Sequence, residues 1–453
     1  MKIFGRLLFK WYFHKNLYVK ALASLEKYPC NGDELWACYS LGMYDTVAKS
    51  LWNGRHLKGG FAFCVSLAAV GRLKEAESAA KKLEELHGFD KYRFKFASAI
   101  ALYMPSLALK IADSPLAPRS LLAGLLVQAG EQERALQLLE NIHGEAYLLK
   151  SNILNFSPKE QLNALSSFLV SRGLAKVLAL DETKCVSVAN IKCVALPKKS
   201  GKMPLVSVLM TSYNTSSYVK YSLESILAQT YKNLEIIVVD DNSTDETPKI
   251  IKEIAAEDKR VKFFANKINI GTYASKTLAL KHAKGEFIAC HDSDDFAHNE
   301  WIKRQIKPLL KNSALIAAVS QWIKIDECGR YCARSAYPLL KLHSTSLLFR
   351  KKIVLEKTGS WDIVRTGADS EFYARLKLVF GKEAIKYIKL PLIIGAYRKN
   401  SLTASVEDGY DSHARLKYWE AWTKWHIDCF KKGEKPVMTA DKRPFPIPKE
   451  IAV

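Results

Sequence analysis

The sequence predicts an all-α, solenoid-like region followed by an α/β domain whose sheet is mostly parallel. Three observations support this prediction. Up to about residue 180, apolar residues recur at helical spacing between turn signals. From residue 205 onward, short β-branched or aromatic runs alternate with amphipathic segments. Between the two regions, residues 196–204 carry two prolines, one glycine and three lysines without periodicity, which is typical of a linker.

The helical region contains two similar stretches, residues 62–77 and 122–136. Each holds a helix rich in small residues, then a glycine turn, then a second helix with an alanine shortly after the turn. This layout resembles tetratricopeptide-like helical hairpins, although the repeat period is irregular. We therefore predict a degenerate α-solenoid over residues 1–195.

The composition is that of a folded protein with an unusual charge. The 453 residues are 48% hydrophobic and 25% charged, which excludes disordered, collagenous and disulfide-dense classes. The formal net charge of +22 is divided as +10 over residues 1–200 and +12 over the rest. Because this charge is diffuse and no recognition-helix, zinc-finger or RNA-binding signature is present, nucleic acid is not expected as a partner. The charge favours an anionic glycan or a membrane face.

The N-terminal segment has two open interpretations. Its first 25 residues carry five Lys or Arg and no acid, so this stretch is either a basic amphipathic helix on an anionic membrane or the first core helix. No run of 18 apolar residues exists, and the start lacks the cleavage site of a signal peptide. The nine scattered cysteines predict reduced, buried thiols. We expect a cytoplasmic protein, with peripheral association with the inner membrane left open.

Polar residues follow the predicted strands of the α/β domain. The strands are expected at residues 206–211, 234–240, 261–265 and 287–290, and the helices between them at 218–228, 247–256 and 273–284. In such sheets ligands bind at the carboxyl ends of the strands. The polar stretches at those ends are Thr211–Asn214, Asp240–Asp245, Asn266–Lys276 and His291–Asp295.

The last of these stretches suggests a metal site. Carboxylates placed directly after an apolar strand are costly unless they hold a metal or a ligand. The spacing of Asp292 and Asp294 lets both reach one hard cation, Mg²⁺ or Mn²⁺. Each motif alone has a structural alternative, since two aspartates this close occur by chance and Asp241–Thr244 is also a good helix start.

Taken together, the motifs carry a specific resemblance. They are PLVSVLMTSYN from Pro204, LESILAQTY from Leu223, IVVDDNSTD from Ile237, NIG from Asn269 and HDSDD from His291. In this order and spacing they resemble family 2 glycosyltransferases of the inverting GT-A fold, over about residues 203–405. The resemblance implies a GT-A domain at residues 205–405, followed by a C-terminal helical extension at 406–453.

The resemblance also implies residue roles. Tyr213 would pack against the nucleotide base, and Asp240 or Asp241 would accept a hydrogen bond from the base or ribose. Asp292 would face the ribose and the metal, and Asp294 would coordinate the metal. Asp295 either faces the metal or caps the next helix, and His343 either lines the site or is a packed residue. The remaining nucleotide-sugar contacts are assigned to Thr211, Asn214, Asn269, Lys276 and Arg398, with Lys399 as an alternative to Arg398.

An inverting transfer also needs a general base for the acceptor hydroxyl. Asp369 matches the catalytic aspartate of the family, and Glu371 is the second choice. Ala368 departs from the pattern because the family has an acid at this position. A purely structural role for Asp369, as a helix N-cap, is the alternative.

These residues predict a metal-dependent, inverting glycosyltransferase. The resemblance implies a nucleotide-sugar donor, with a UDP-sugar favoured, and an anionic or lipid-linked glycan acceptor in bacterial capsule or lipopolysaccharide synthesis. The helical region would present the acceptor or bind partner enzymes. The alternative, which Ala368 leaves open, is an inactive scaffold that binds a nucleotide or glycan.

Overall fold

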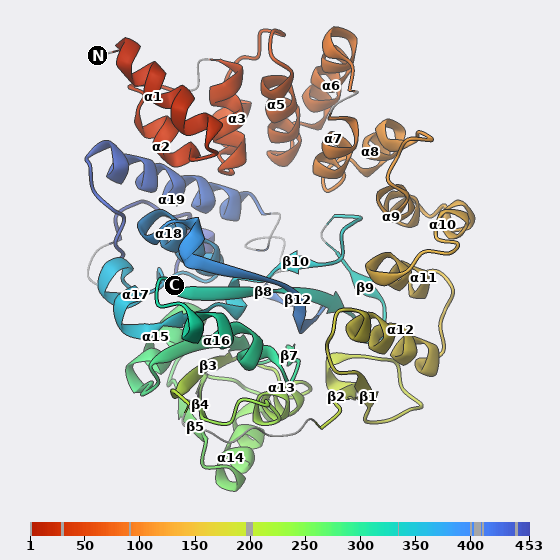
Figure 1. The fold of residues 1–453 in the computed structure, drawn as a ribbon, viewed down its shortest axis with the longest axis vertical. Helices are drawn as coiled ribbons and strands as arrows, with labels where there is room; N and C mark the ends of the chain where they lie inside the picture. Colours follow the sequence, from red (N-terminus) through yellow and green to blue (C-terminus); the bar gives the residue numbers. More distant parts are fainter. Residues whose placement is uncertain are drawn as a thin grey trace.

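The computed structural model describes most of the chain in a single assembly of helices around one large sheet (Figure 1). The described residues are 2–28, 31–89, 92–195, 203–333, 335–398, 401–402, 409, 412–439 and 443–453. Residues 196–202 of the predicted linker and Lys399 therefore lie outside the described residues.

Residues 2–195, here called the helical arm, run along the top and down one side of the sheet (Figure 1). Both similar stretches fold as helical hairpins, α5–α6 and α9–α10. Their turns need glycine, because Gly71 and Gly130 have φ of +83° and +82°. The helices of the arm are α1 (Lys2–His14), α2 (Tyr18–Ala23), α3 (Gly32–Ser40), α4 (Tyr44–Ala48), α5 (Leu57–Ala69), α6 (Leu73–His87), α7 (Arg93–Ile100), α8 (Pro105–Ala112), α9 (Arg119–Ala129), α10 (Gln132–Leu138), α11 (Leu148–Ser151) and α12 (Pro158–Ser171).

The end of the arm differs from the all-helical prediction. Here β1 (Val177–Ala179) and β2 (Ile191–Cys193) pair as a small antiparallel sheet. Three residues per strand are too few to show an alternating pattern in the sequence. The prediction of helices alone therefore agrees with the structure only as far as α12, and residues 177–193 include two strands.

The described part of the second region forms a ten-stranded mixed sheet in the order β5-β4-β3-β6-β11-β8-β12-β7, with β9 and β10 on β8. Its first four strands are parallel neighbours and follow the predicted ranges closely. All seven residues of β3 and of β4 are buried, as expected for central parallel strands. The strands are β3 (Val206–Ser212), β4 (Leu234–Asp240), β5 (Val261–Ala265), β6 (Phe287–Asp292), β7 (Phe296–Ala297), β8 (Ala317–Ile325), β9 (Tyr331–Cys332), β10 (Lys341–Leu342), β11 (Leu348–Arg350) and β12 (Ile385–Ala396).

Helices cover both faces of this sheet. One apolar core joins one face to the helical arm, from Phe9 through Val208 to Ile394. A second core lies on the other face and includes Phe372 and Trp422. The helices of this region are α13 (Val219–Leu227), α14 (Thr247–Glu257), α15 (Thr272–His282), α16 (Trp301–Lys311), α17 (Lys351–Thr358), α18 (Ala368–Phe380) and α19 (His413–Lys431).

The arm contacts the sheet domain near both of its ends. At the N-terminal end, Trp419 Nε1 of α19 donates to the Leu41 carbonyl at 2.8 Å. At the other end, Asn152 Nδ2 donates to the Tyr331 carbonyl and Asn152 Oδ1 accepts from the Tyr331 N–H, both at 2.8 Å. The arm is therefore held at two separate places, and it shares a core with the sheet.

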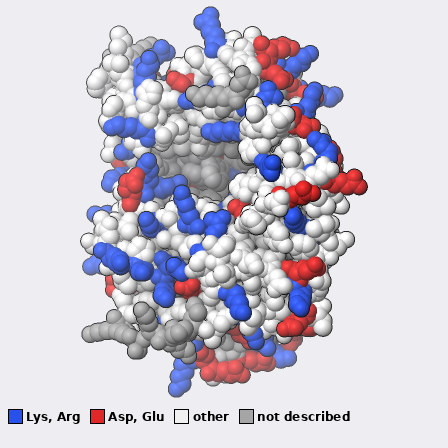
Figure 2. Space-filling view, turned by 45° about the vertical axis from the view of Figure 1, so that its right-hand side comes forward, with Lys and Arg blue, Asp and Glu red and all other residues white. Residues whose placement is uncertain are grey.

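Figure 2 shows a hollow on one face of the molecule, with Lys and Arg side chains around it.

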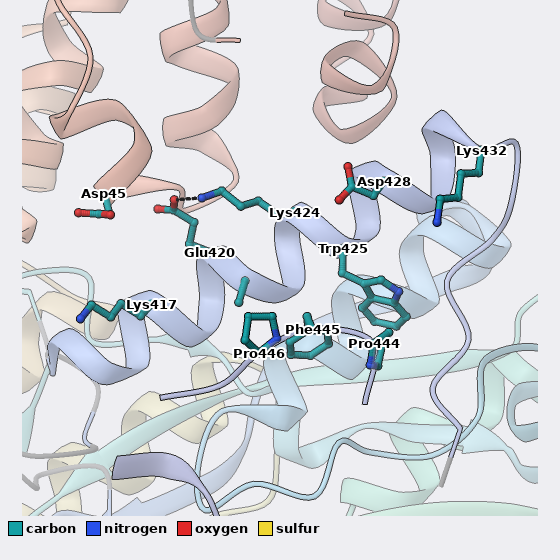
Figure 3. A pocket seen from close by; sticks show the side chains of 11 residues that line it. Asp45, Lys417, Glu420, Lys424, Trp425, Asp428, Lys432, Pro444, Phe445 and Pro446 are labelled. Carbon is teal, nitrogen blue, oxygen red and sulfur yellow. Dashed lines mark hydrogen bonds and ion pairs between the residues drawn. The ribbon is translucent and has the colours of Figure 1, made fainter. Parts of the chain in front are cut away.

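A pocket of about 490 Å³ lies where the arm meets α19 (Figure 3). One part of its lining is charged, and there Lys424 Nζ lies 2.6 Å from Glu420 Oε1. Another part is apolar, and there the centroids of the Trp425 and Phe445 rings lie 5.3 Å apart. Trp422 and Trp425 of α19 are buried. No helix in the described ranges has both the length and the apolar character needed to cross a bilayer.

Candidate active site

The polar stretches after β3, β4 and β6 meet at one edge of the sheet, as predicted. The strands are in parallel register, with Ser212 opposite Asp240 and Thr211 opposite Asp292. Thr211 Oγ1 lies 2.7 Å from Thr272 Oγ1 at the start of α15. This edge therefore brings together residues from three strands and one helix.

Asp240 and the Tyr213–Asn214 turn are linked through the loop after β4. The buried Asp240 carboxylate accepts from the Ser243 N–H at 2.9 Å and from the Ser243 hydroxyl at 2.6 Å. Asn214 has φ of +49° and accepts from the Thr244 N–H at 2.9 Å. The half-exposed Tyr213 ring is left at the surface of this edge, where a base could stack on it.

Asp241 fixes the loop after β5. Its buried carboxylate accepts from the backbone N–H groups of Ile270 at 2.9 Å and Gly271 at 2.8 Å, and from Asn266 Nδ2 at 2.8 Å. Asn269 precedes these amides and is exposed. Asp241 thus shapes the loop that presents Asn269 and begins α15.

Lys276 lies between two acids. Its side chain is 2% exposed, and its Nζ lies 3.5 Å from Asp292 Oδ1 and 3.6 Å from Asp369 Oδ2. Burial lowers the pKa of this ammonium, but Asp369 and Asp292 more than offset that effect and raise the pKa well above its usual range. Lys276 is therefore a charged group that joins the strand edge to α18.

Asp369 lies in the first turn of α18, and among the described residues its carboxylate forms hydrogen bonds through Oδ2. This oxygen accepts from the Tyr273 hydroxyl at 2.9 Å and from Thr345 Oγ1 at 3.0 Å. The N-cap of the helix is Gly367, with φ of +92°, so the N-cap role considered for Asp369 is not seen. The side chain is 12% exposed. Among the described residues, Oδ1 has no hydrogen-bond partner and can accept from a ligand.

Glu371 occupies a different environment from Asp369. Its fully buried carboxylate pairs with Arg375, at 2.9 and 2.8 Å, and with His426 Nε2 at 3.0 Å. Burial acts to raise the pKa of Glu371, but Arg375 and His426 lower it overall. Residues two apart on a helix lie on different faces, so α18 directs Glu371 into the core rather than toward the edge. The structure does not bring this second-choice base to the site.

Asp292, Asp295 and His343 form a cluster in which the possible ligand atoms lie within 4.8 Å of one another. His343 stacks on Trp322, with ring centroids 4.1 Å apart. In the described part of the chain, Asp295 Oδ2 and His343 Nδ1 are buried without hydrogen-bond partners. Burial, with repulsion from Asp294 and Asp292, raises the pKa of Asp295 well above its usual range, and burial lowers that of His343. Two carboxylates and an imidazole with unused acceptor atoms fit a divalent cation.

Asp294 lies outside this cluster and is paired with Arg398. Its Oδ2 lies 2.8 Å from Arg398 Nε and 2.6 Å from Arg398 Nη2. The Arg398 guanidinium also lies 5.5 Å from the Tyr218 ring, and the Tyr218 hydroxyl donates to Glu327. The structure therefore brings Arg398 to the carboxylate stretch after β6. The cluster of possible metal ligands around Asp292 contains Asp295 and His343, and it does not contain the predicted ligand Asp294.

Sequence reasoning missed several residues of the site. Tyr273 and Thr345 contact Asp369, and Trp322 supports His343. Tyr273 lies within the polar stretch Asn266–Lys276 but has no predicted role, and Thr345 and Trp322 belong to no motif. Trp322 lies in β8, and Thr345 lies in the segment before β11. Neither segment has a phosphate-binding or metal-binding spacing that would mark these residues. Only tertiary packing brings them to the edge.

The residues of this site lie in a part of the chain that is similar to known proteins. The model of the family "Glycosyl transferase family 2" matches residues 207–370. The Escherichia coli "UDP-Glc:alpha-D-GlcNAc-diphosphoundecaprenol beta-1,3-glucosyltransferase WfaP" is 43% identical over 205 residues, which cover 45% of this chain and 80% of that protein. The chain belongs to glycosyltransferase family 2. Family membership and the observed sheet confirm the predicted GT-A fold and the preceding helical region.

Other family 2 relatives match over shorter stretches. An uncharacterized glycosyltransferase of Haemophilus influenzae is 42% identical over 129 residues, which cover 28% of this chain and 40% of that protein. The chain spans less than half the length of the first curated relatives that it matches. The solved structure of S. aureus TarS in complex with UDP-GlcNAc is 22% identical, with a TM-score of 0.36 over 43% of this chain and 59% of that one.

Proposed function

We propose that the chain is an inverting, metal-dependent glycosyltransferase. It moves a sugar from a nucleotide-sugar donor, with a UDP-sugar favoured, to a lipid-linked or anionic glycan in bacterial surface polysaccharide synthesis. The observation that carries the proposal is the bridge of Lys276 between Asp292 at the strand edge and Asp369 on α18. This bridge supports the proposal because it links Asp369 to the carboxyl ends of the strands, where ligands bind in such sheets.

Asp369 acts as the general base in this proposal. An acceptor hydroxyl binds at its open Oδ1, while Tyr273, Thr345 and Lys276 hold Oδ2. The hydroxyl oxygen attacks the anomeric carbon from the face opposite the nucleoside diphosphate. Its proton passes to Asp369, the bond to the diphosphate breaks, and the anomeric configuration inverts. Glu371 has no part in this step.

The donor diphosphate lies near the carboxylates after β6. Asp292, Asp295 and His343 would hold Mn²⁺ or Mg²⁺. Asp294, which lies outside this cluster, would join them as a further carboxylate ligand once Arg398 releases it. When bound, the cation stabilises the negative charge of the departing diphosphate. Arg398, whose Nε and Nη2 now both contact Asp294 Oδ2, can turn to pair with two phosphate oxygens.

The remaining donor contacts follow the strand edge. Tyr213 stacks on the base, Asp240 or Asp241 accepts from the base or ribose, and the other predicted residues contact the donor. These are Thr211, Asn214, Asn269 and Lys276. In this assignment Lys276 serves both the donor edge and the base.

Two observations support the proposed acceptor class: the activity for which WfaP is named and the charge of this chain. WfaP is named for a lipid-linked GlcNAc diphosphate acceptor. This chain has a net charge of +22, with basic side chains around a hollow (Figure 2). A basic surface attracts an anionic diphosphate-linked or acidic glycan. We therefore propose an acceptor of this class, reached from the cytoplasmic side of the membrane.

An inactive scaffold is the second candidate, and the observation behind it is Ala368. This residue is fully buried at the first position of α18, where the family pattern has an acid. A scaffold would still bind a nucleotide or glycan, but it would neither transfer nor hydrolyse the sugar.

A thermal-shift panel tests the donor proposal. The protein is melted with Mn²⁺ and UDP, GDP, UDP-glucose, UDP-GlcNAc or GDP-mannose, because a ligand of the folded state raises Tm with its saturation. We expect the UDP compounds to raise Tm, and Asp292→Asn to lose that shift while Asp113→Asn on the arm keeps it. A panel in which no nucleotide changes Tm overturns the proposal. A shift with no sugar transfer or donor hydrolysis supports the scaffold.

A further inference from the structure

The N-terminal helix α1 has an exposed apolar stripe. Ile3, Phe4, Leu7 and Trp11 are 81%, 68%, 62% and 51% exposed. Their spacing of one, three and four residues places them along one side of a helix. Four large apolar side chains on one helix are an unusual concentration for a surface in contact with water.

The opposite side of α1 already supplies the core contact. Phe9 and Phe13 are buried and belong to the core of the arm. The backbone of α1 also lies close to the next helix, because a Cβ at Gly5 would stand 2.6 Å from the Ser24 carbonyl oxygen. The helix is therefore packed through one side, and the exposed stripe is not needed to hold it in place.

Basic side chains flank the stripe. Arg6 and Lys10 are exposed on one side of it. On the other side, Lys15 Nζ lies 3.6 Å from the centre of the Trp11 ring. No Asp or Glu occurs before Glu26. Apolar residues at the centre with cations at the edges complement an anionic bilayer, whose acyl region accepts the former and whose headgroups attract the latter.

We propose that this outer face of α1, formed by Ile3, Phe4, Leu7 and Trp11 with Arg6 and Lys10 beside it, docks on an anionic membrane surface. The helix lies in the plane of the interface, and the folded chain remains on one side of the bilayer. The surface is separate from the candidate active site. It would keep the enzyme near a lipid-linked acceptor, but binding itself requires neither donor nor acceptor.

Vesicle co-sedimentation of the full chain tests this surface. The probes are phosphatidylcholine vesicles with and without one quarter phosphatidylglycerol. We expect wild type to bind the anionic vesicles, and I3S/L7S/W11S and R6E/K10E each to bind them at least about tenfold more weakly. The matched controls are L51S/L116S, which replaces two other exposed leucines of the arm, and K110E/K159E, which reverses two other exposed lysines. Both controls should bind as wild type does.

Other outcomes overturn the proposal. Equal binding by wild type and both α1 variants would show that another surface is used. Equal binding of wild type to neutral and anionic vesicles would show that attraction between basic side chains and anionic headgroups does not contribute. A wild-type dimer that I3S/L7S/W11S abolishes, without vesicle binding, would assign the face to a second copy of the chain. The replaced side chains are exposed, so unchanged melting curves should accompany any loss of binding. Since no nucleotide is present, failure of the transferase proposal leaves this result unaffected.

Discussion

Lys276 Nζ lies 3.6 Å from Asp369 Oδ2 and so connects the proposed general base to the strand edge of the GT-A domain. The same nitrogen lies 3.5 Å from Asp292 Oδ1. One buried cation therefore compensates two carboxylates from different elements, β6 and α18. This pairing links Asp369 on α18 to Asp292 at the strand edge without a bound substrate.

Replacing Lys276 should damage both stability and transfer. Lys276→Met leaves two carboxylates without their shared cation, and loss of one partner of a buried ion pair costs about 3–5 kcal/mol. Urea unfolding, followed by fluorescence, measures this change. Lys276→Arg, which keeps the charge, should recover part of the loss. An unfolding midpoint of Lys276→Met equal to that of wild type would show that the bridge contributes little.

Removal of divalent cations should abolish sugar transfer, and Mn²⁺ should restore it. Asp295→Asn and His343→Gln should each raise the Mn²⁺ concentration for half-maximal rate by at least about tenfold, because loss of even an outer-shell partner of a metal ligand costs about 10–100-fold in affinity. Transfer assays over a Mn²⁺ series after EDTA dialysis measure the change, with Asp113→Asn as an exposed carboxylate control. Full activity in EDTA would contradict the metal dependence.

The Glu371–Arg375–His426 cluster should make stability depend on pH. The pKa of Glu371 is below its usual range because, against the effect of burial, Arg375 and His426 favour its charged form. Its stabilisation is thus present above the unfolded pKa of about 4.3 and is lost as pH falls through the lower folded value. Glu371→Gln should cost about 3–5 kcal/mol at pH 7.

Melting curves of wild type and Glu371→Gln between pH 3 and pH 8 measure this dependence. The difference between them should shrink at acid pH, because the wild-type carboxylate then becomes neutral. A difference that stays constant over the whole range would refute the assignment of the effect to Glu371 ionisation.

The contact between Asn152 and Tyr331 should stabilise the join between arm and sheet. Asn152→Ala removes both partners of the Tyr331 backbone groups, and unsatisfied buried groups cost about 1–3 kcal/mol each. Differential scanning calorimetry should show a lower Tm for Asn152→Ala than for Gln137→Ala, an exposed position on α10. Equal Tm values would indicate that water replaces the lost bonds.

Local patterns predicted the parallel half of the sheet well. The ranges of β4 and β5 agree with the prediction at both ends, because each is a short β-branched or aromatic run between turn signals. The order of motifs also placed Thr211, Asp241 and Asp292 at one edge. Register between parallel strands is the physical reason, since it aligns the residues that follow them.

The rest of the site depends on packing that no spacing reveals. His343 reaches Asp295 because β8 and the segment before β11 lie side by side, with His343 stacked on Trp322. Sequence spacing alone therefore leaves two roles open for Asp295 and two for His343. Glu371, the second-choice base by resemblance to the family, instead faces the core, because residues two apart on a helix lie on different faces.

The most direct test of the central claim is transfer by Asp369→Asn beside wild type and Glu371→Gln. The assay uses the nucleotide sugar with the largest Tm shift, Mn²⁺ and a diphosphate-lipid-linked GlcNAc acceptor, with NMR of the product to read its anomeric configuration. We predict an inverted product from wild type, and for Asp369→Asn a rate about 10²–10⁴-fold lower with its donor-induced Tm shift intact. Glu371→Gln should keep the rate of its folded fraction. Transfer by Asp369→Asn at the wild-type rate, or a product with retained configuration, would contradict the account.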